Sequence, residues 1–349
     1  MPLTDAAEAR VHAALERHRA PLLAGLRAAI DAPRVGYARY MRYHFGWESA
    51  AGATIDEAAG KLLRPALCLV SCEAAHGDPA RAMPAAIALE LVHNFTLIHD
   101  DIEDGSDTRH GRATLWRLVG IPQAINAGDG MFVIARRTLL GMADAGVPAQ
   151  AVLGAARTLD DACVALCEGQ YADIGFEERP QVSVEEYEAM IAGKTAALLG
   201  AAAAIGALAA GADARTVDAL HACGRLLGMA FQVQDDVLGI WGDAEATGKP
   251  VADDIRSRKK SFPVVYAMAN LPEASRAELA AIYRGEHVDE AAVGAVLRLL
   301  EAAGARDAST AVATRWAAAA VEALHGLDLE PERRADLEAF AEFFVRRKV

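Results

Sequence analysis

Residues 85–104 read AAIALELVHNFTLIHDDIED and combine the apolar periodicity of a buried helix with an acidic C-terminal end. In a helix over this range, His93 shares one face with Asp100, Asp101 and Asp104. The helix dipole is negative at that end, so carboxylates are disfavoured there, and an apolar environment disfavours them further. Solvation at the surface would tolerate the cluster. A divalent cation would remove the conflict, because carboxylate oxygens at i, i+1 and i+4 are suitable ligands for Mg²⁺.

A second acidic pair follows another apolar helix. Residues 231–250 read FQVQDDVLGIWGDAEATGKP, and Asp235 and Asp236 follow the apolar run 225–233. Gln232 and Gly239 share their helical face. Two Asp-Asp pairs on separate long helices indicate metal binding more specifically than one pair does. They predict two acidic helix ends that face each other across a bundle and hold several Mg²⁺ ions around one polyphosphate.

The composition predicts an all-α protein. Of the 349 residues, 53% are apolar and only 6% aromatic, alanine is abundant, and alternating strand patterns are scarce. We expect one large helical bundle around a central cavity, as a single domain over residues 1–349. The periodicity predicts helices at about 5–31, 35–45, 53–75, 82–104, 121–143, 148–172, 183–193, 194–211, 214–241, 261–270, 273–283, 288–303, 306–325 and 330–347.

Charge and targeting signals restrict the class of protein. The net charge of −13 argues against nucleic-acid binding, which needs a basic face. Residues 1–19 lack the pattern of a secretion signal, so we expect a cytoplasmic protein. The uncharged run 196–212, AALLGAAAAIGALAAGA, is short for a membrane span and rich in small residues, which predicts a closely packed core helix.

Five cysteines lie in apolar helical sequence. Two pairs are spaced i, i+4, which is compatible with a four-thiolate zinc site, but no turn residues accompany them. We therefore expect buried free thiols in a reducing compartment. The cysteines are Cys68, Cys72, Cys163, Cys167 and Cys223.

Basic residues recur between and after the acidic clusters. A lone GKT without the upstream glycines of a P-loop does not predict a nucleotide cradle. Together with the aspartates, however, the cations predict a site for an apolar diphosphate. They are Lys61 and Arg64 in GKLLRP (60–65), Arg109 and Arg112 in TRHGR (108–112), Lys194 beside Thr195 in GKT (193–195), Lys249 in TGKP (247–250), and Arg258, Lys259 and Lys260 in SRKKSFP (257–263).

These segments resemble the trans-isoprenyl diphosphate synthase family. GKLLRP, ELVHNFTLIHDDIED followed by TRHG, GQYAD, GKTAALLG, FQVQDDVLG followed by TGKP, and KKSFP occur in the order and rough spacing of that family, over about residues 50–270. The resemblance implies an all-α bundle, usually a homodimer, that condenses isopentenyl diphosphate head-to-tail with an allylic diphosphate. It also implies that the departing diphosphate, rather than a side chain, takes up the released proton.

The resemblance also implies roles for individual residues. Mg²⁺, as three ions when the diphosphate is bound, would be held by Asp100, Asp101, Asp104, Asp235 and Asp236. The residues matching the allylic-diphosphate site are Arg109, Lys194, Thr195, Gln232, Lys249 and Lys259. Those matching the isopentenyl-diphosphate site are Lys61, Arg64, His93 and, in place of an arginine, His110. Among these, Asp100, Asp101, Asp104, Arg109, Lys194 and Asp235 would be the catalytic residues.

Two positions depart from the family pattern. Gly239 stands where the second motif has a third aspartate, and His110 stands where a second arginine follows Arg109. Arginine is permanently charged and binds phosphate with two N–H groups, whereas histidine at neutral pH has neither property. Arg112 is one candidate to compensate. The others are His110 itself, held protonated by the diphosphate, and the basic C-terminal run 345–349.

Phe95 and Thr96, which precede the first motif, are relevant to product length. Phe95 and Thr96 lie five and four positions before Asp100, so they are predicted to point down the cavity. Phe95 is either a floor for the growing chain or an ordinary core aromatic. By resemblance, an aromatic residue here favours a C20 product, with C15 next. Two alternatives to the synthase are a terpene cyclase on the same scaffold and a non-catalytic partner subunit.

Overall fold

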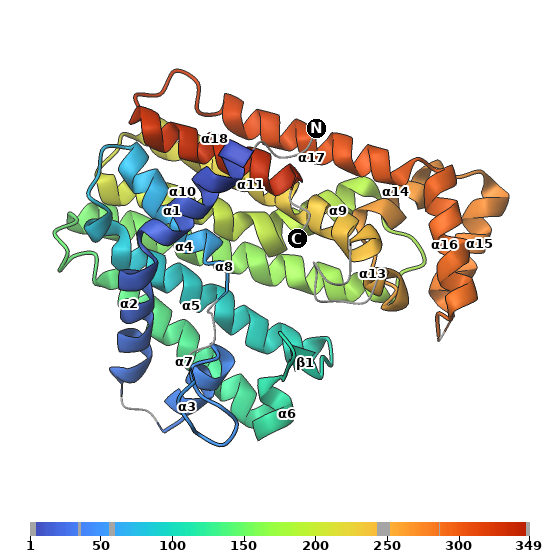
Figure 1. The fold of residues 1–349 in the computed structure, drawn as a ribbon, viewed down its shortest axis with the longest axis horizontal. Coiled ribbons are helices and arrows are strands. Elements are labelled where there is room, and N and C mark those ends of the chain that lie inside the picture. The colour runs from blue at the N-terminus through green and yellow to red at the C-terminus, as the bar shows by residue number, and fades with distance from the viewer. Residues whose placement is uncertain (1–4, 34–35, 56–59, 243–251, 286, 347–349) are drawn as a thin grey trace.

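The computed structural model describes residues 5–33, 36–55, 60–242, 252–285 and 287–346. In this part of the chain the regular structure is helical, apart from an isolated bridge and one short hairpin of β1 (Thr108–Arg109) and β2 (Arg112–Ala113). Figure 1 shows long helices packed roughly alongside one another. The predicted all-α class is confirmed.

The centre of the bundle is α10 (Ala197–Ala210), whose small side chains are almost all buried. It packs against α4 (Leu63–Ala74), α5 (Pro79–Glu103), α8 (Ala149–Glu177) and α11 (Ala214–Trp241). At Gly206 a side chain would overlap the carbonyl oxygen of Cys68, so only glycine permits this approach of α10 to α4. The continuous helix Val184–Ala210 is long and apolar enough to span a membrane, but most of it is buried inside the protein. The prediction of a core helix for this run agrees with that burial.

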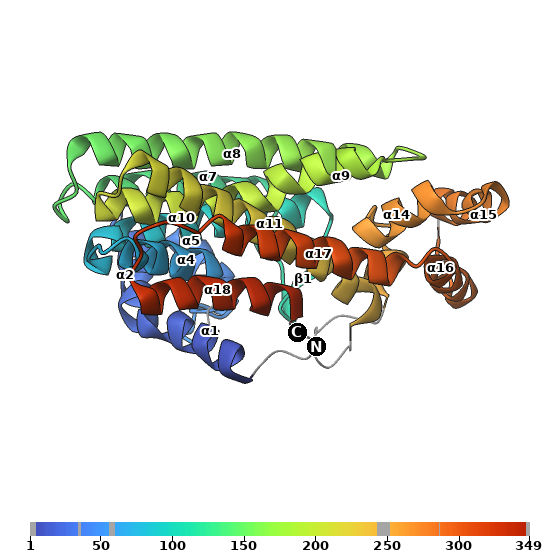
Figure 2. The same cartoon turned by 90° about the horizontal axis from the view of Figure 1, so that it is seen from above.

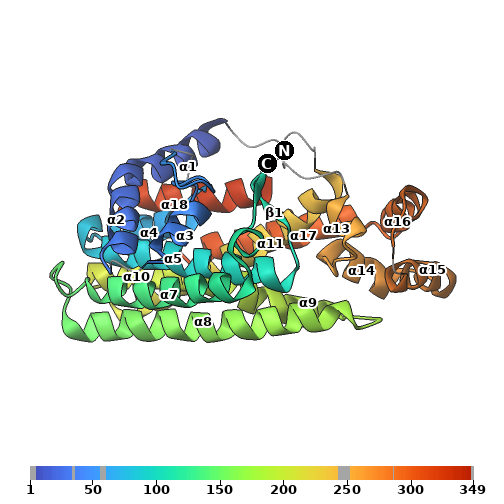
Figure 3. The same cartoon turned by 90° about the horizontal axis from the view of Figure 1, so that it is seen from below.

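Further helices surround this centre. On one side lie α1 (Asp5–Arg17), α2 (Arg19–Asp31) and α18 (Pro331–Arg346), and on the opposite side lie α8 and α9 (Val184–Ile191), as Figure 2 shows. Next to α5 are α6 (Leu115–Val119) and α7 (Ile121–Leu140), with α7 beside α8 in Figure 3. The short helix α3 (Ala38–His44) packs against α2 and α7. One end of the bundle carries α13 (Asp253–Arg256), α14 (Phe262–Asn270), α15 (Glu273–Arg284) and α16 (Glu290–Ala302). The helix α17 (Ala305–Glu322) joins this end to the rest of the bundle.

Local sequence signals determine where the site-bearing helices begin. The Asp78 carboxylate caps α5 by accepting a hydrogen bond from the Ala80 N–H at 2.9 Å, and Pro79 occupies the first turn. Asp213 caps α11 in the same way, through the Thr216 N–H at 2.8 Å. These caps fix the residues at which α5 and α11 begin.

Some predicted boundaries differ from the observed ones. The helix predicted at 5–31 is interrupted at His18, which separates α1 from α2. The helix predicted at 53–75 begins only at Leu63, because Leu62 has a φ of 55°, in the left-handed region that ends helices. Cys167 is exposed, so the prediction of five buried thiols was wrong at that position, although all five thiols are free.

A buried ion-pair cluster joins the N-terminal and C-terminal helices to the bundle. Arg17 donates to Glu73 at 2.9 Å and to Asp336 at 2.8 Å, and the His18 ring nitrogen lies 3.0 Å from Glu73. Burial alone would raise the pKa of Glu73, but His18 and Arg17 hold this pKa below its ordinary value of 4.5. The ionised form of Glu73 therefore contributes to the stability of the fold.

Candidate active site

A cavity of about 700 Å³ opens between α4, α5, α10 and α11, and the β1–β2 hairpin contributes to its wall. The C-terminal parts of α5 and α11 bring Asp100 and Asp235 to this cavity, whereas α10 contributes the apolar side chain of Leu198. Eleven of the residues predicted for the site line this cavity: Lys61, Arg64, His93, Thr96, Asp100, Arg109, His110, Lys194, Thr195, Gln232 and Asp235.

Asp100 and Asp235 bring carboxylates to the cavity from two different helices. Burial raises the pKa of Asp100 to about 7, and the neighbouring charges of Asp104 and Glu103 act in the same direction, while Lys194 opposes them. A carboxylate in such surroundings is readily ionised by a nearby cation. The electrostatic conflict predicted for the acidic end of α5 is therefore present in the folded protein.

Asp101 has a different environment from Asp100. Its side chain is buried and accepts hydrogen bonds from Arg109, at 2.9 and 3.1 Å from Nε and at 2.8 Å from Nη2. This bidentate pairing is the strong geometry for arginine and carboxylate. It fixes the Arg109 side chain against the end of α5, while Arg109 still lines the cavity. Asp104 is the exposed C-cap residue of α5.

The hairpin turn explains the position of His110. His110 and Gly111 occupy the two turn positions with φ values of 51° and 74°, as a tight primed hairpin turn requires. The turn places Arg112 directly opposite Arg109 in the ladder. Arg112 donates to the backbone carbonyls of Tyr43 at 2.8 Å and His44 at 3.2 Å, and it lines the cavity. A second arginine is thus present beside Arg109, although it is not adjacent in sequence.

Lys194 and Thr195 lie in a π-helical turn, η1 (Ala192–Ala196), between α9 and α10. Such turns are rare and often mark functional sites. Gly169 on α8 allows the close approach of η1, since a side chain there would overlap the Lys194 backbone nitrogen. Lys194 Nζ then lies 2.5 Å from the Asp173 carboxylate of α8. Lys194 and Asp100 both line the cavity.

Asp236 is the centre of a buried hydrogen-bond network. Its Oδ2 accepts from Tyr187 Oη at 2.5 Å and from the Phe262 N–H at 2.8 Å, and its Oδ1 accepts from Gln232 Nε2 at 3.1 Å and Lys259 Nζ at 3.2 Å. Gln232 in turn accepts from the Thr195 hydroxyl at 2.7 Å. Both oxygens of Asp236 are therefore used by protein donors, in contrast to the cavity-facing position of Asp235.

Arg64 and His93 form a cationic and polar corner of the cavity. Arg64 Nε is buried and has no hydrogen-bond partner among the described residues. Burial lowers the pKa of Arg64, while Glu90 and Asp235 oppose that effect. Burial, with the nearby charges of Arg64 and Arg109, also lowers the pKa of His93, so its ring is neutral. An unpaired guanidinium N–H in a cavity is a site for an anionic oxygen.

Several site residues were not identified from the sequence. Asp173 lies within GQYAD, and its pairing with the predicted residue Lys194 was not foreseen. His44 lines the cavity, and its pKa is lowered to about 3 by burial and by Arg109 and Arg112. Tyr187 and Asn94 carried no sequence signal, because isolated polar groups in apolar helices have no characteristic pattern.

The residues predicted to limit chain length lie on two sides of α5. Thr96 is buried and lines the cavity. Phe95 was predicted to point down the cavity but is not among the residues that line it. Instead it packs toward α7, with its ring 5.0 Å from the Phe132 ring and 5.8 Å from the His99 ring. Lys249 lies outside the described residues.

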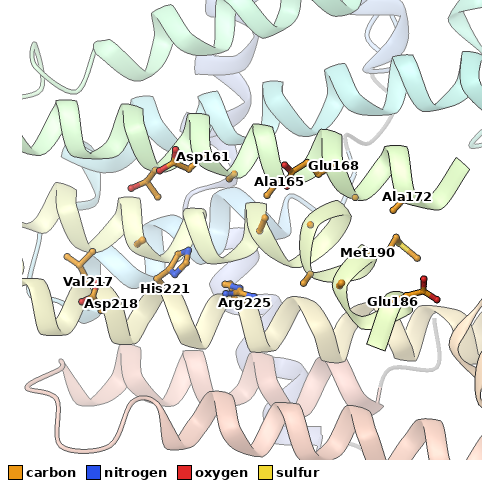
Figure 4. A pocket seen from close by; sticks show the side chains of 18 of the residues that line it. Asp161, Ala165, Glu168, Ala172, Glu186, Met190, Val217, Asp218, His221 and Arg225 are labelled. Atoms are coloured by element: carbon orange, nitrogen blue, oxygen red, sulfur yellow. The ribbon is translucent and has the colours of Figure 1, made fainter. Parts of the chain in front are cut away.

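A second depression of about 860 Å³ lies on the outer face, between α8, α9 and α11 (Figure 4). Figure 4 shows Asp161 and Glu168 on one wall, and Asp218, His221 and Arg225 on the other. None of the described residues predicted for the site lines it. We therefore assign the chemistry to the smaller cavity, which holds the convergent polar groups.

The donor set of the smaller cavity is suited to Mg²⁺. Within the described residues, no three His, Cys, Asp or Glu side chains form a ready-made metal cage. Mg²⁺ is commonly bound by one or two carboxylates together with substrate phosphates and water. Asp100 and Asp235 supply such carboxylates from two different helices. The unpaired Arg64 Nε can bind a further anionic oxygen.

Comparisons with known proteins identify the family. A family model described as Polyprenyl synthetase matches residues 47–300. The chain is 41% identical to a geranylgeranyl diphosphate synthase of Mycobacterium tuberculosis, over 96% of this chain and 94% of that protein. It is also 41% identical to a (2E,6E)-farnesyl diphosphate synthase of Mycobacterium bovis, over 88% of this chain and 85% of that protein.

Solved structures give the same result. A polyprenyl synthetase from Streptomyces coelicolor superposes with a TM-score of 0.89 at 41% identity, covering 96% of this chain and 99% of that chain. A geranylgeranyl pyrophosphate synthase from Corynebacterium glutamicum, complexed with isoprenyl diphosphate and magnesium, superposes with a TM-score of 0.78 at 27% identity and covers 98% of each chain. The chain belongs to the polyprenyl synthetase family and is a prenyltransferase of the short-chain prenyl diphosphate synthase type.

Proposed function

We propose that this protein condenses isopentenyl diphosphate head-to-tail with an allylic diphosphate in a Mg²⁺-dependent reaction, with a C20 product favoured over C15. One observation carries the proposal: Asp100 and Asp235 enter the same cavity as two separate groups of diphosphate-binding side chains. A site for two diphosphates needs two such groups. The magnesium-bound relative from Corynebacterium glutamicum supports the choice of metal. The five free thiols fit a cytoplasmic enzyme.

In this proposal some aspartates bind metal and others position neighbouring residues. Asp100, Asp104 and Asp235 would hold Mg²⁺, as three ions when diphosphate is bound. Asp101 and Asp236, which were predicted as ligands, act instead as positioning residues, because Arg109 and the Asp236 network already use their oxygens. When bound, the metal stabilises the negative charge that develops on the departing diphosphate.

The allylic diphosphate would be bound by cations that surround the acidic helix ends. Arg109 and Lys194 are held in place by Asp101 and Asp173 respectively, so they are ordered before the substrate binds. Preorganised cations stabilise charge on the leaving oxygens without reorganisation during the reaction. Lys259, with Thr195 and Gln232 through the Asp236 network, supports the same diphosphate.

Isopentenyl diphosphate would occupy the corner formed by Lys61, Arg64 and His93. Arg64 Nε needs an acceptor, and a diphosphate oxygen provides one. The neutral ring of His93 can donate one N–H. Arg112, opposite Arg109 in the hairpin, supplies the guanidinium that His110 lacks. This arrangement retains the second diphosphate site despite the substitution.

The cavity walls protect the reacting carbon atoms. Leu166, Leu198 and Phe231 line the cavity beyond the polar groups. An allylic cation is quenched by water, so an apolar wall prolongs its lifetime until the alkene of isopentenyl diphosphate attacks. A proton is then lost from the adjacent carbon, and the departed diphosphate is the closest strong acceptor in this arrangement.

Product length would be limited on the α7 side of α5. Phe95, one to two helical turns before Asp100 on α5, forms an aromatic pair there with Phe132 of α7. We propose that this pair stops chain growth at C20. Thr96, being small, leaves the nearer part of the cavity open to the chain.

We also propose a homodimer formed through α6, α7 and α8. Among the described residues, the exposed large apolar side chains all lie on these three helices: Leu118, Ile121, Ile125, Val133, Leu140, Leu153, Val164, Tyr171 and Ile174. Contiguous apolar surface of this kind marks an interaction site, and a symmetric pair of such helices can cover itself.

The test is a primer assay. Purified protein is incubated with Mg²⁺, labelled isopentenyl diphosphate and, in separate reactions, C5, C10 and C15 allylic diphosphates, and the products are sized. Elongation to C20 supports the proposal. A hydrocarbon formed from the allylic substrate alone would indicate a cyclase, and no turnover with any primer would indicate a non-catalytic subunit.

A further inference from the structure

Gly239 lies on α11, one helical turn after Asp235. The family resemblance implies an aspartate at this position, the third of the second motif, but glycine has no side chain. The space is already filled: a Cβ placed on Gly239 would lie 2.5 Å from Cγ and 2.8 Å from Oδ1 of Asp254, and would overlap Oδ2. The carboxylate of Asp254 therefore occupies the volume that an aspartate at position 239 would need.

The local backbone directs Asp254 to this position. Asp254 belongs to the short helix α13, which begins after Ala252 in the left-handed region, with φ of 60°. Its carbonyl accepts a hydrogen bond from the Lys259 N–H at 2.9 Å, which closes the turn that follows α13. The side chain is buried against α11 rather than exposed to solvent. Burying a carboxylate is costly unless it has a partner, and Lys259 supplies a positive charge 3.9 Å from Oδ2 of Asp254.

The charges around Asp254 belong to the second acidic cluster. Lys259 Nζ lies 3.9 Å from Oδ2 of Asp254 and 3.2 Å from Oδ1 of Asp236, so the lysine lies between the two carboxylates. Burial alone would lower the pKa of Lys259, but Asp236, Asp254 and Asp173 raise it. Lys259 therefore remains charged, and its position depends on both carboxylates.

We propose that Asp254 supplies, from α13, the third carboxylate of the second aspartate motif, and that glycine at position 239 is what admits it. Asp254 is a positioning residue: it holds Lys259 against Asp236, whose partner Gln232 lines the diphosphate cavity. The inference rests on the proposed function of that site. The cluster then keeps three carboxylates, from Asp235, Asp236 and Asp254, although the sequence motif contains only two.

The test exchanges the residues at positions 239 and 254. Four variants are compared with the wild type: Asp254→Asn, Gly239→Asp, the double variant Gly239→Asp with Asp254→Gly, and Asp253→Asn as a neighbouring control on the same short helix. Binding of inorganic diphosphate in the presence of Mg²⁺ is measured by calorimetry, thermal unfolding reports on folding, and the Mg²⁺ concentration for half-maximal condensation is determined.

Asp254→Asn keeps the shape of the side chain and removes its charge. It should weaken Mg²⁺-dependent diphosphate binding by about tenfold or more, as loss of a supporting group around a metal site does. Gly239→Asp should lose binding and unfold at a lower temperature, because the two side chains overlap. The double variant should recover both properties, and Asp253→Asn should match the wild type.

Wild-type binding by Asp254→Asn, or a double variant no better than Gly239→Asp alone, would overturn the inference. The same measurements distinguish failure of the proposed function from failure of the role of Asp254. If the wild type elongates no primer, the proposed function fails. If the wild type elongates a primer and binds diphosphate while Asp254→Asn does the same with unchanged affinity, only the role of Asp254 fails.

Discussion

Asp235 and Asp236 are adjacent in sequence but have different surroundings, so replacing each by asparagine should impair different properties. Asp235 lines the cavity, whereas Asp236 is buried and accepts four hydrogen bonds. Asparagine at position 236 retains one acceptor oxygen and places an NH₂ group where the other oxygen was. Two of the four donors would then face a donor instead of an acceptor.

The size of the effect follows from that count. A buried donor without an acceptor costs about 1–3 kcal/mol, so two such donors cost about 2–6 kcal/mol. The entropy of unfolding is about 2.1 cal/mol/K per residue, or about 0.7 kcal/mol/K for 349 residues. We expect Asp236→Asn to lower Tm by about 3–8 °C. Asp235→Asn should lower Tm by less than Asp236→Asn does, and it should slow condensation by about a hundredfold or more, as loss of a metal contact implies.

The assay pairs differential scanning calorimetry, without substrates or metal, with steady-state condensation rates at saturating Mg²⁺. Equal Tm values for the two variants would refute the distinction between a buried network and a cavity-facing ligand. So would a fully stable Asp236→Asn variant that loses only activity, since Asp236 would then act on the substrate or metal directly.

Four further outcomes are expected. Phe95→Ala should lengthen the product on reversed-phase thin-layer analysis, and an unchanged length would remove Phe95 as the floor. Glu73→Gln should lower Tm at pH 7, and the difference from wild type should vanish as pH falls through the depressed pKa of Glu73, below 4.5, because the ionised form alone stabilises the fold. Arg112→Ala should raise KM for isopentenyl diphosphate more than for the primer, and equal changes would contradict its assignment. Val133→Glu should yield monomers in light scattering, and an intact dimer would place the interface elsewhere.

Much of the site was predictable because its residues lie on helices with strong periodicity. Asp100 and Asp235 could be placed on cavity-facing helix ends from spacing alone, and both line the cavity. Spacing could not separate Asp100 from Asp101, because adjacent residues on a helix differ by only 100° in direction. The partner of Asp101, Arg109, comes from a hairpin whose turn, His110 and Gly111, has no common sequence signature.

The sequence by itself determined the all-α class, the position of the two acidic helix ends and the chemistry that such ends can perform. These follow from local propensity and periodicity, which act over a few residues. Only the tertiary structure decided which groups share a cavity, that Arg112 lies beside Arg109, and that Asp254 fills the space at Gly239. Those relations join residues far apart in the chain or across a turn, and they depend on how closely helices approach, which side-chain size and backbone geometry determine only in the packed molecule.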